Sequence, residues 1–248
     1  MVKKIAAPFQ YPGFYTNNAE VIDNNHFFVA LNVNTGFISS TRLAIWNFDS
    51  LGNELWHYEQ QELDNGHVKS AIPAFQSGAY ATSHYIPQAD VDPKFLGVRQ
   101  LAVRKFNVQG IQEWEYKDLF SESSMSTQYL LVYPNDDLLL MMKLSGNPLD
   151  AVYLLKISST GERLWRRKIT DSSSYGGNLQ MRDIAFAPDG QICITGSRYD
   201  TVIVNNKALP DGAVWLLCLD SMGCLSPGCG DYQDVVTAVQ EPKLKALE

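Results

Sequence analysis

Short apolar runs separated by polar turn residues extend along the whole chain. Gly, Asn, Asp, Pro and Ser residues interrupt the apolar stretches about every 8–12 residues, a spacing typical of successive strands. No long stretch carries apolar residues at the i, i+3, i+4, i+7 spacing of an amphipathic helix. The pattern therefore predicts an all-β protein.

One sequence motif occurs three times in full. It consists of a strand, a glycine turn and a second strand that begins near a tryptophan. It stands at Leu43–Trp56, Leu101–Trp114 and Val152–Trp165, and a fourth copy begins at Val214 and breaks off after Gly223. A period of about 50–60 residues is typical of one four-stranded propeller blade with variable loops. We therefore predict a β-propeller of four-stranded blades, with four copies countable and four or five blades in total.

The repeats divide the chain into one propeller domain, residues 1–230, and a polar tail or linker, residues 231–248. Leu247-Glu248 is typical of the remnant of an expression tag. Because the fourth copy lacks its last strand, we predict that the N-terminal segment Met1–Thr16 completes the last blade, which would remove open sheet edges. The predicted blades cover, in order, residues 18–60, 61–118, 119–170 and 171–230.

Each copy places a short polar residue shortly before the glycine of its turn. Glycine supplies the positive φ that tight hairpins need at little steric cost, and a short polar side chain can close an Asx or Ser turn onto the backbone. The turn glycines are Gly52, Gly110, Gly161 and Gly223, and the polar residues before them are Asp49, Asn107, Ser158 and Asp220.

The recurring tryptophans, Trp56, Trp114 and Trp165, fall on one face of the last strand of each copy, and Trp215 belongs to the third strand of the fourth copy. We predict that the first three pack over the neighbouring strand of their own blade as repeat-defining core residues. A role in stacking on a ligand is disfavoured, because ligand sites rarely recur identically in every blade.

Three long segments between predicted strands are the expected place for function, because binding residues concentrate on loops held by a rigid scaffold. They are Asn34–Thr41, Pro87–Gly97 and Arg198–Gly212. Their aromatic and amide side chains suit a shallow site for a glycan or a peptide. The candidate ligand-binding residues are Phe37, Phe95, Tyr199, Asn205 and Asn206.

Charge and composition restrict the partners. Hydrophobic residues make up 45% of the chain and charged residues 19%, which is enough apolar content for a packed core. The net charge of −7 leaves no basic excess to neutralise phosphates, so nucleic acid is not the expected partner. No apolar run approaches the roughly 20 residues of a spanning helix, so membrane insertion is not expected either.

The four cysteines do not follow a metal-binding pattern. Cys193 and Cys218 lie in apolar strand contexts and are expected to be buried free thiols. Cys224 and Cys229 flank a turn, where a small disulfide would imply an oxidising compartment. A zinc half-site is the less favoured alternative for this pair.

The repeat resembles a propeller-like family of secreted and surface proteins of Bacteroidetes, with distant similarity to quinoprotein-type and WD-type propellers. The resemblance rests on Asp189-Gly190, Trp215–Asp220 and Tyr153–Lys168. The ending Asp220–Cys229 is similar to the last repeat that often precedes a C-terminal sorting domain in that family. The resemblance implies a secreted or outer-membrane surface location and transfers no catalytic motif.

No residue set in the sequence forms a recognisable catalytic, metal or cofactor site. The histidines are scattered, Asp90 and Asp92 are ordinary turn residues, and Ser174–Gly177 lacks a following helix that would complete a phosphate loop. We therefore expect a non-catalytic scaffold that binds an unknown protein, peptide or glycan and uses no cofactor. Two alternatives stay open: a carbohydrate-active hydrolase or lyase with a site on the propeller face, and a purely structural spacer.

Overall fold

The computed structural model describes residues 13–21, 26–34, 41–60, 67–73, 78–85, 99–120, 124–145, 151–170, 178–204, 207–225, 228–230 and 232–234. The chain divides into two compact units. The first comprises Met1–Gly146 with Tyr153–Arg166, and the second comprises Asn147–Val152 with Arg167–Glu248. The boundary between the units passes through the third of four sheets.

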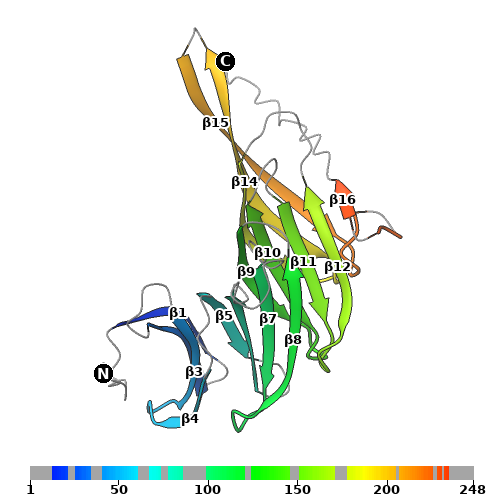
Figure 1. The fold of residues 1–248 in the computed structure, drawn as a ribbon. Helices are drawn as coiled ribbons and strands as arrows, with labels where there is room; N and C mark the ends of the chain where they lie inside the picture. The colour runs from blue at the N-terminus through cyan, green and yellow to red at the C-terminus, as the bar shows by residue number, and fades with distance from the viewer. Residues whose placement is uncertain are drawn as a thin grey trace, which may run out of the picture. The chain divides into compact units, whose positions relative to one another are not determined.

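All regular structure in the described part of the chain is β, in sheets formed by consecutive strands (Figure 1). The first sheet has the order β1-β2-β3-β4 and the second β5-β6-β7-β8. The third has the order β16-β12-β11-β10-β9, and the fourth β13-β14-β15. The strands are β1 (Gly13–Val21), β2 (His26–Asn34), β3 (Thr41–Asp49), β4 (Glu54–Glu59), β5 (His67–Pro73), β6 (Ala79–Tyr85), β7 (Arg99–Phe106), β8 (Gln112–Phe120), β9 (Ser124–Val132), β10 (Leu138–Ser145), β11 (Ala151–Ile157), β12 (Arg163–Thr170), β13 (Asn178–Phe186), β14 (Ile192–Val204), β15 (Lys207–Leu219) and β16 (Tyr232–Asp234).

The all-β prediction is confirmed, and so is the repetition of one sheet type along the sequence. Each of the first three sheets contains an antiparallel meander of four strands, because short turns bring each strand back beside the previous one. Among the described residues, no helix has the length and apolar character to cross a membrane.

Two segments differ from the prediction. Gly13–Thr16, part of the segment expected to complete the last blade, belongs instead to β1, which pairs with β2 in the first sheet. Residues 1–12 lie outside the described part. The predicted loop Arg198–Gly212 is a hairpin, because β14 and β15 stay paired from Ile192↔Leu219 out to Val204↔Lys207.

The chain after the last glycine turn returns to an earlier sheet. Three residues of the predicted tail form β16, which runs parallel to the end of β12 with Lys168 opposite Tyr232 and Thr170 opposite Asp234. The fourth sheet therefore keeps three strands within the described residues.

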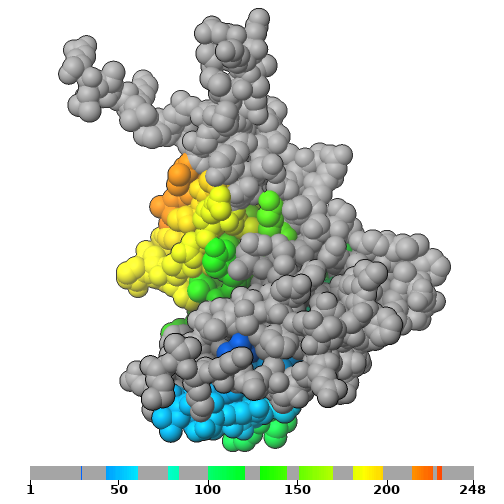
Figure 2. Space-filling view, turned by 90° about the vertical axis from the view of Figure 1, so that its left-hand side faces the viewer, coloured from blue at the N-terminus to red at the C-terminus, as the bar shows by residue number. Residues whose placement is uncertain are grey.

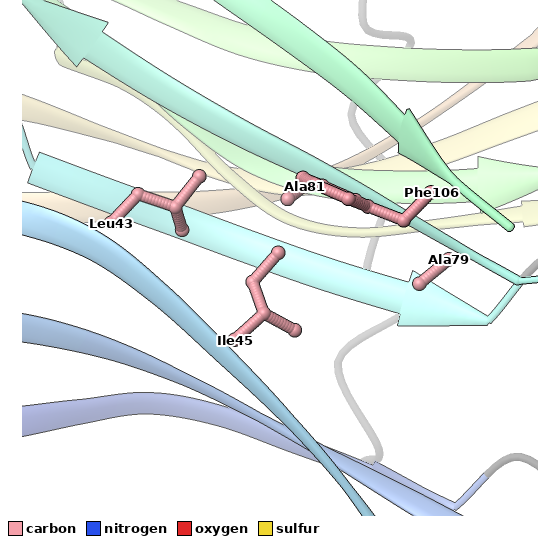
Figure 3. Packing of buried hydrophobic residues seen from close by; sticks show 5 residues of the cluster. All are labelled: Leu43, Ile45, Ala79, Ala81 and Phe106. Carbon is pink, nitrogen blue, oxygen red and sulfur yellow. The ribbon is translucent and has the colours of Figure 1, made fainter. Parts of the chain in front are cut away.

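Successive sheets of the first unit bury apolar side chains between them. Leu43 and Ile45 of β3 lie in one cluster with Ala79 and Ala81 of β6 and Phe106 of β7, all at 0–1% exposure (Figure 3). The small alanines let the strands of the second sheet approach the larger side chains of the first. Removing this apolar surface from water stabilises the stack of sheets.

Candidate functional site

The same turn closes the hairpin between the third and fourth strands of the first three sheets. In the first, Gly52 N–H donates to Asp49 O at 2.9 Å, and Asp49 N–H donates to Asn53 O at 2.9 Å. The glycine has a φ of 76°, and its counterparts have φ of 78°, 90° and 72°. This left-handed conformation explains why glycine recurs at these positions, which are Gly52, Gly110, Gly161 and Gly223.

The predicted polar caps of these turns are confirmed. The side chain of Asn107 accepts hydrogen bonds from Gln109 N–H and Ile111 N–H, both at 3.0 Å. Asp49 accepts from Leu51 N–H and Asn53 N–H, and Asp220 accepts from Met222 N–H and Cys224 N–H. Ser158 Oγ accepts a hydrogen bond from Glu162 N–H at 3.0 Å and shares another with Thr160 Oγ1 at 2.9 Å. Each side chain thus satisfies backbone donors that the tight turn leaves without a ladder partner.

Two of the recurring tryptophans pack over the turn glycine of the following repeat. A Cβ added to Gly110 would lie 2.5 Å from Cδ2 of Trp56, and one added to Gly161 would lie 2.9 Å from Cδ2 of Trp114. Trp56 also stacks near Phe106, with ring centroids 6.4 Å apart. These tryptophans therefore join one sheet to the next, whereas the sequence had placed them over a neighbouring strand of their own blade.

The second of these contacts includes a hydrogen bond. Trp114 Nε1–H donates to Ser159 O in the turn of the third repeat at 2.9 Å. Within its own sheet Trp114 also lies near Tyr80, with centroids 5.7 Å apart. A flat indole needs a glycine beneath it and an acceptor at its edge, and this turn supplies both.

Two ion pairs in the described sheets include a buried charged side chain, Arg104 in one and Asp137 in the other. Arg104, at 3% exposure, donates to Ser83 Oγ at 2.7 Å and forms an ion pair with Glu115 at 2.7 Å. Lys156 lies 3.4 Å from Asp137 and 4.0 Å from the ring centre of Tyr133. Paired charges in such a setting fix the register of packed strands, since leaving one of them without its partner is costly.

A polar cluster lies between β8 and β12 around Asp118. Its carboxylate accepts from the Tyr116 hydroxyl at 2.9 Å and from Arg166 at 3.4 Å, and Arg163 lies 3.9 Å away. Burial, followed by the hydrogen bond to Asp118, raises the pKa of Tyr116 above its ordinary value. The contacts of Asp118 with Arg163 and Arg166 join β8 to β12.

The aromatic neighbours of Asp118 complete this cluster. Arg166 lies 5.8 Å from the ring centres of both Phe120 and Tyr153, which meet edge to face at 5.5 Å. No local sequence pattern indicates this cluster, because Phe120 and Tyr153 are more than 30 positions apart and only the packing of the sheets brings them together. In the described part of the chain, no group of three His, Cys, Asp or Glu residues could hold a metal ion.

Of the five candidate ligand-binding residues, only Tyr199 lies in the described part of the chain. Tyr199 lies in β14, opposite Gly212, where the sequence analysis had expected a loop. Phe37, Phe95, Asn205 and Asn206 lie outside the described residues. Tyr199 is thus the only one of the five whose position the described residues give.

Beyond Tyr199 the β14–β15 hairpin becomes an arm of two strands. The pairing of β13 with β14 ends at Asn178↔Tyr199, whereas β14 and β15 continue to pair from Asp200↔Asp211 to Val204↔Lys207. We call Asp200–Val204 with Lys207–Asp211 the hairpin arm, which is the far end of the β14–β15 hairpin in Figure 1. Within the described residues, no third strand pairs with either edge of the arm.

Both pairs of cysteines form disulfides. Cys193 of β14 lies opposite Cys218 of β15, with Cα atoms 4.2 Å apart, so the expectation of free buried thiols is wrong. Cys218 is exposed, since it faces away from the packed side of the sheet. Cys224 and Cys229 close a loop of sequence separation 5.

No protein-family model matches the chain, and no curated protein matches it. The chain is similar in structure to a protein of unknown function from Bacteroides caccae, with 12% identity and a TM-score of 0.42. This likeness covers 76% of the chain and 57% of the Bacteroides protein, so the chain spans little more than half of that protein's length. A second likeness, over 88% of this chain and 69% of the other, is to an N-acetylgalactosamine deacetylase from F. plautii in complex with blood group B trisaccharide, with 11% identity and a TM-score of 0.37.

Proposed function

We propose that the chain is a non-catalytic, secreted or cell-surface scaffold whose sheets are the blades of a β-propeller. The proposal of a propeller is supported by the repeated four-stranded meander and by the repeated packing of one tryptophan on the next repeat's glycine. A secreted location is supported by the two disulfides, since such bonds persist in oxidising compartments.

The proposed binding role rests on the hairpin arm. An extended two-stranded arm presents backbone donors and acceptors along its edges, and an added peptide strand can pair with such an edge. The residue at the base of the arm, Tyr199, is of an aromatic type that stacks on sugars or fills peptide pockets. We therefore propose that the arm binds an extended peptide or a glycan.

The test is a peptide and glycan array probed with the full chain and with a variant that lacks the arm. Because Tyr199 and Gly212 face each other in register, replacing residues 200–211 with Asn-Gly closes the hairpin at that pair. We expect ligands found with the full chain to lose at least about tenfold in affinity in the short-arm variant and in Tyr199→Ala.

Leu55→Ala is the matched control, because Leu55 is an exposed side chain of β4 in the other unit. The melting temperatures of all variants establish that the sheets remain folded. Array ligands that bind the short-arm variant as well as the full chain would exclude the arm as the binding site. An array without any ligand would instead support the spacer function.

A further inference from the structure

The fourth sheet differs from the others at the edge of its third strand. In the first three sheets the third strand pairs with a fourth, β3 with β4, β7 with β8 and β11 with β12. β15 is the equivalent third strand, because it ends at the same glycine turn, and within the described residues it is the last strand of its sheet. The described atoms of β15 and its turn lie at the surface beside those of β13 and β14, in orange and yellow in Figure 2.

The chain leaves the edge of β15 directly after the turn. The Cα atoms of Cys224 and Cys229 are 5.6 Å apart. Five residues of an extended strand would span about 17 Å, at roughly 3.3 Å per residue. The disulfide therefore prevents residues 224–229 from running along β15 as β4 runs along β3. The next described strand, β16, pairs with β12 instead.

Alternate backbone groups of β15 point to this edge. The Cα distance of 4.2 Å between Cys193 and Cys218 is that of a non-hydrogen-bonded pair, whose N–H and C=O groups point away from each other. β14 and β15 pair without a register shift, so the alternation holds along the strand. The residues that direct their N–H and C=O away from β14 are Gly212, Val214, Leu216 and Cys218.

The first repeat uses the same backbone groups to hold its fourth strand. Leu43 O accepts a hydrogen bond from Gln60 N–H, which follows β4, at 2.9 Å. Leu43 stands six residues before the polar turn residue of its repeat, and Val214 stands six residues before that of the fourth repeat. The edge of β15 thus presents the donors and acceptors that a fourth strand would pair with.

The side chains beside this edge are apolar and exposed. Val214 is 83% exposed and Leu216 is 67% exposed, whereas Trp215 and Leu219 on the opposite face of β15 are buried. The equivalent residues of the first two repeats are only 0–1% exposed; they are Leu43, Ile45, Leu101 and Val103. An added strand that carries large apolar side chains on this face would remove part of the exposed surface from water.

The fourth strands of the first two sheets indicate the chemistry of such a strand. Each places a tryptophan and a tyrosine, two positions apart, opposite the third strand. The opposed pairs are Asn47–Trp56, Ile45–Tyr58, Lys105–Trp114 and Val103–Tyr116. The corresponding positions of β15, two and four residues before the polar turn residue, are Cys218 and Leu216. Because residues directly opposite each other share a face of the sheet, the two aromatic side chains of an added strand would cover these two residues.

We propose that β15 accepts an extended peptide of a partner protein as its fourth strand, antiparallel to Gly212–Cys218. The peptide carries two aromatic residues separated by one residue, the first opposite Cys218 and the second opposite Leu216. Backbone hydrogen bonds to the edge supply affinity, and the alternate aromatic side chains supply specificity. The stretch ends before the hairpin arm, because Pro210 has no N–H to offer at this edge, so the inference does not rest on the proposed function of the arm.

The first experiment measures the binding of a dye-labelled peptide with the sequence of β8, Gln112–Phe120, to the full chain by fluorescence anisotropy. We expect binding, and we expect at least about tenfold weaker binding of a matched peptide in which serine replaces Trp114 and Tyr116. The serine peptide keeps the length and the charge of the first. Melting temperatures establish that each protein variant below is folded.

A protein variant tests the other side of the contact. Leu216→Asp should weaken binding of the β8 peptide at least about tenfold, because its carboxylate would lie against the aromatic side chain. Leu55→Asp is the matched control, since Leu55 is an exposed leucine of β4 in the other unit, and it should bind as tightly as the wild type.

Hydrogen exchange of the full chain with and without the β8 peptide locates the added strand. We expect slower exchange of the backbone amides in residues 212–218 and unchanged exchange in residues 200–211. The short-arm variant, in which Asn-Gly replaces residues 200–211, should bind the β8 peptide as tightly as the full chain.

Equal binding of the two peptides, or protection confined to the hairpin arm, would overturn the proposal. So would a full chain that does not bind the β8 peptide below about 1 mM. If Leu216→Asp then lowered the melting temperature of the chain alone, a segment of the same chain would be the occupant of the edge, and if it did not, the edge would stay unpaired. Array ligands that are lost in the short-arm variant would still support the proposed function of the arm.

Discussion

Single residues of this chain are most predictable at its turns. The positions of Gly52, Gly110, Gly161 and Gly223 require a positive φ, and the polar residues before them accept backbone hydrogen bonds. These requirements are local, so the sequence alone predicts them. The burial of Arg104 and the ion pairs of Asp118 depend on neighbouring strands, so no local sequence pattern predicts them.

Substituting Asn107 by alanine removes the acceptor for two backbone N–H groups of its turn. We expect a loss of about 1 kcal/mol in the free energy of unfolding, measured by urea denaturation. Asn107→Asp keeps the accepting oxygen and is the control that should stay near the wild-type value. Equal losses in both variants would contradict the role of the side chain as an acceptor.

Buried phenol groups should make stability depend on alkaline pH. Burial, with a smaller contribution from Asp137, raises the pKa of Tyr133 to about 12. Because the folded pKa lies above the ordinary value of 10, the folded state holds this proton more tightly than the unfolded state does. The contribution of the protonated Tyr133 to the free energy of unfolding is complete below pH 10 and is lost as the pH rises towards 12.

Urea denaturation between pH 8 and about pH 12 measures this dependence, with Tyr133→Phe as the control that lacks the ionising group. We expect the wild type to lose stability more steeply than the variant above about pH 10. Parallel pH profiles of the two proteins would show that this phenol ionises equally in both states.

At the scale of elements, the sequence predicts most strands of the repeats and misses the longest hairpin. Pro210 and Gly212 in the segment Arg198–Gly212 favour a loop, yet Pro210 lies within β15 opposite Thr201. An edge strand tolerates proline, because an N–H that points away from the partner needs no ladder bond. The β-branched residues Thr201–Val204 were the signal that favoured a strand.

The disulfide across the β14–β15 hairpin gives a prediction at the scale of elements. Cys193 and Cys218 close a loop of sequence separation 25, whereas Cys224 and Cys229 close one of 5. Loop-closure entropy then predicts a loss of about 3.5 kcal/mol in the free energy of unfolding for the double substitution of the first pair by serine and about 2 kcal/mol for the second. Chemical denaturation of the two double variants under non-reducing conditions compares them, and a larger loss from the short loop would contradict the expectation.

At the scale of the whole molecule, the sequence predicts that one type of sheet is repeated, but it does not predict which residues of the next repeat each sheet contacts. The period predicted several like sheets, which the structure contains. It did not indicate that Trp56 and Trp114 reach across to the next repeat, because a tryptophan on a strand face looks the same whichever sheet covers it. The hairpin arm likewise becomes visible only when the pairing of the strands is known.

One contact, tryptophan on the turn glycine of the following sheet, joins successive sheets in the first unit. A double-mutant cycle of Trp56→Ala and Gly110→Ala tests this contact most directly. Gly190→Ala is the reference, since Gly190 has a φ of 84° and nothing within 4 Å of an added Cβ. Gly190→Ala should lower the free energy of unfolding by about 1–2 kcal/mol, through the backbone strain of alanine at a positive φ alone. Gly110→Ala should lose about 1–3 kcal/mol more in the wild type, because its new methyl group meets the indole. In Trp56→Ala the cost of Gly110→Ala should fall to that of the reference, whereas an unchanged cost would mean that this tryptophan does not join the two sheets.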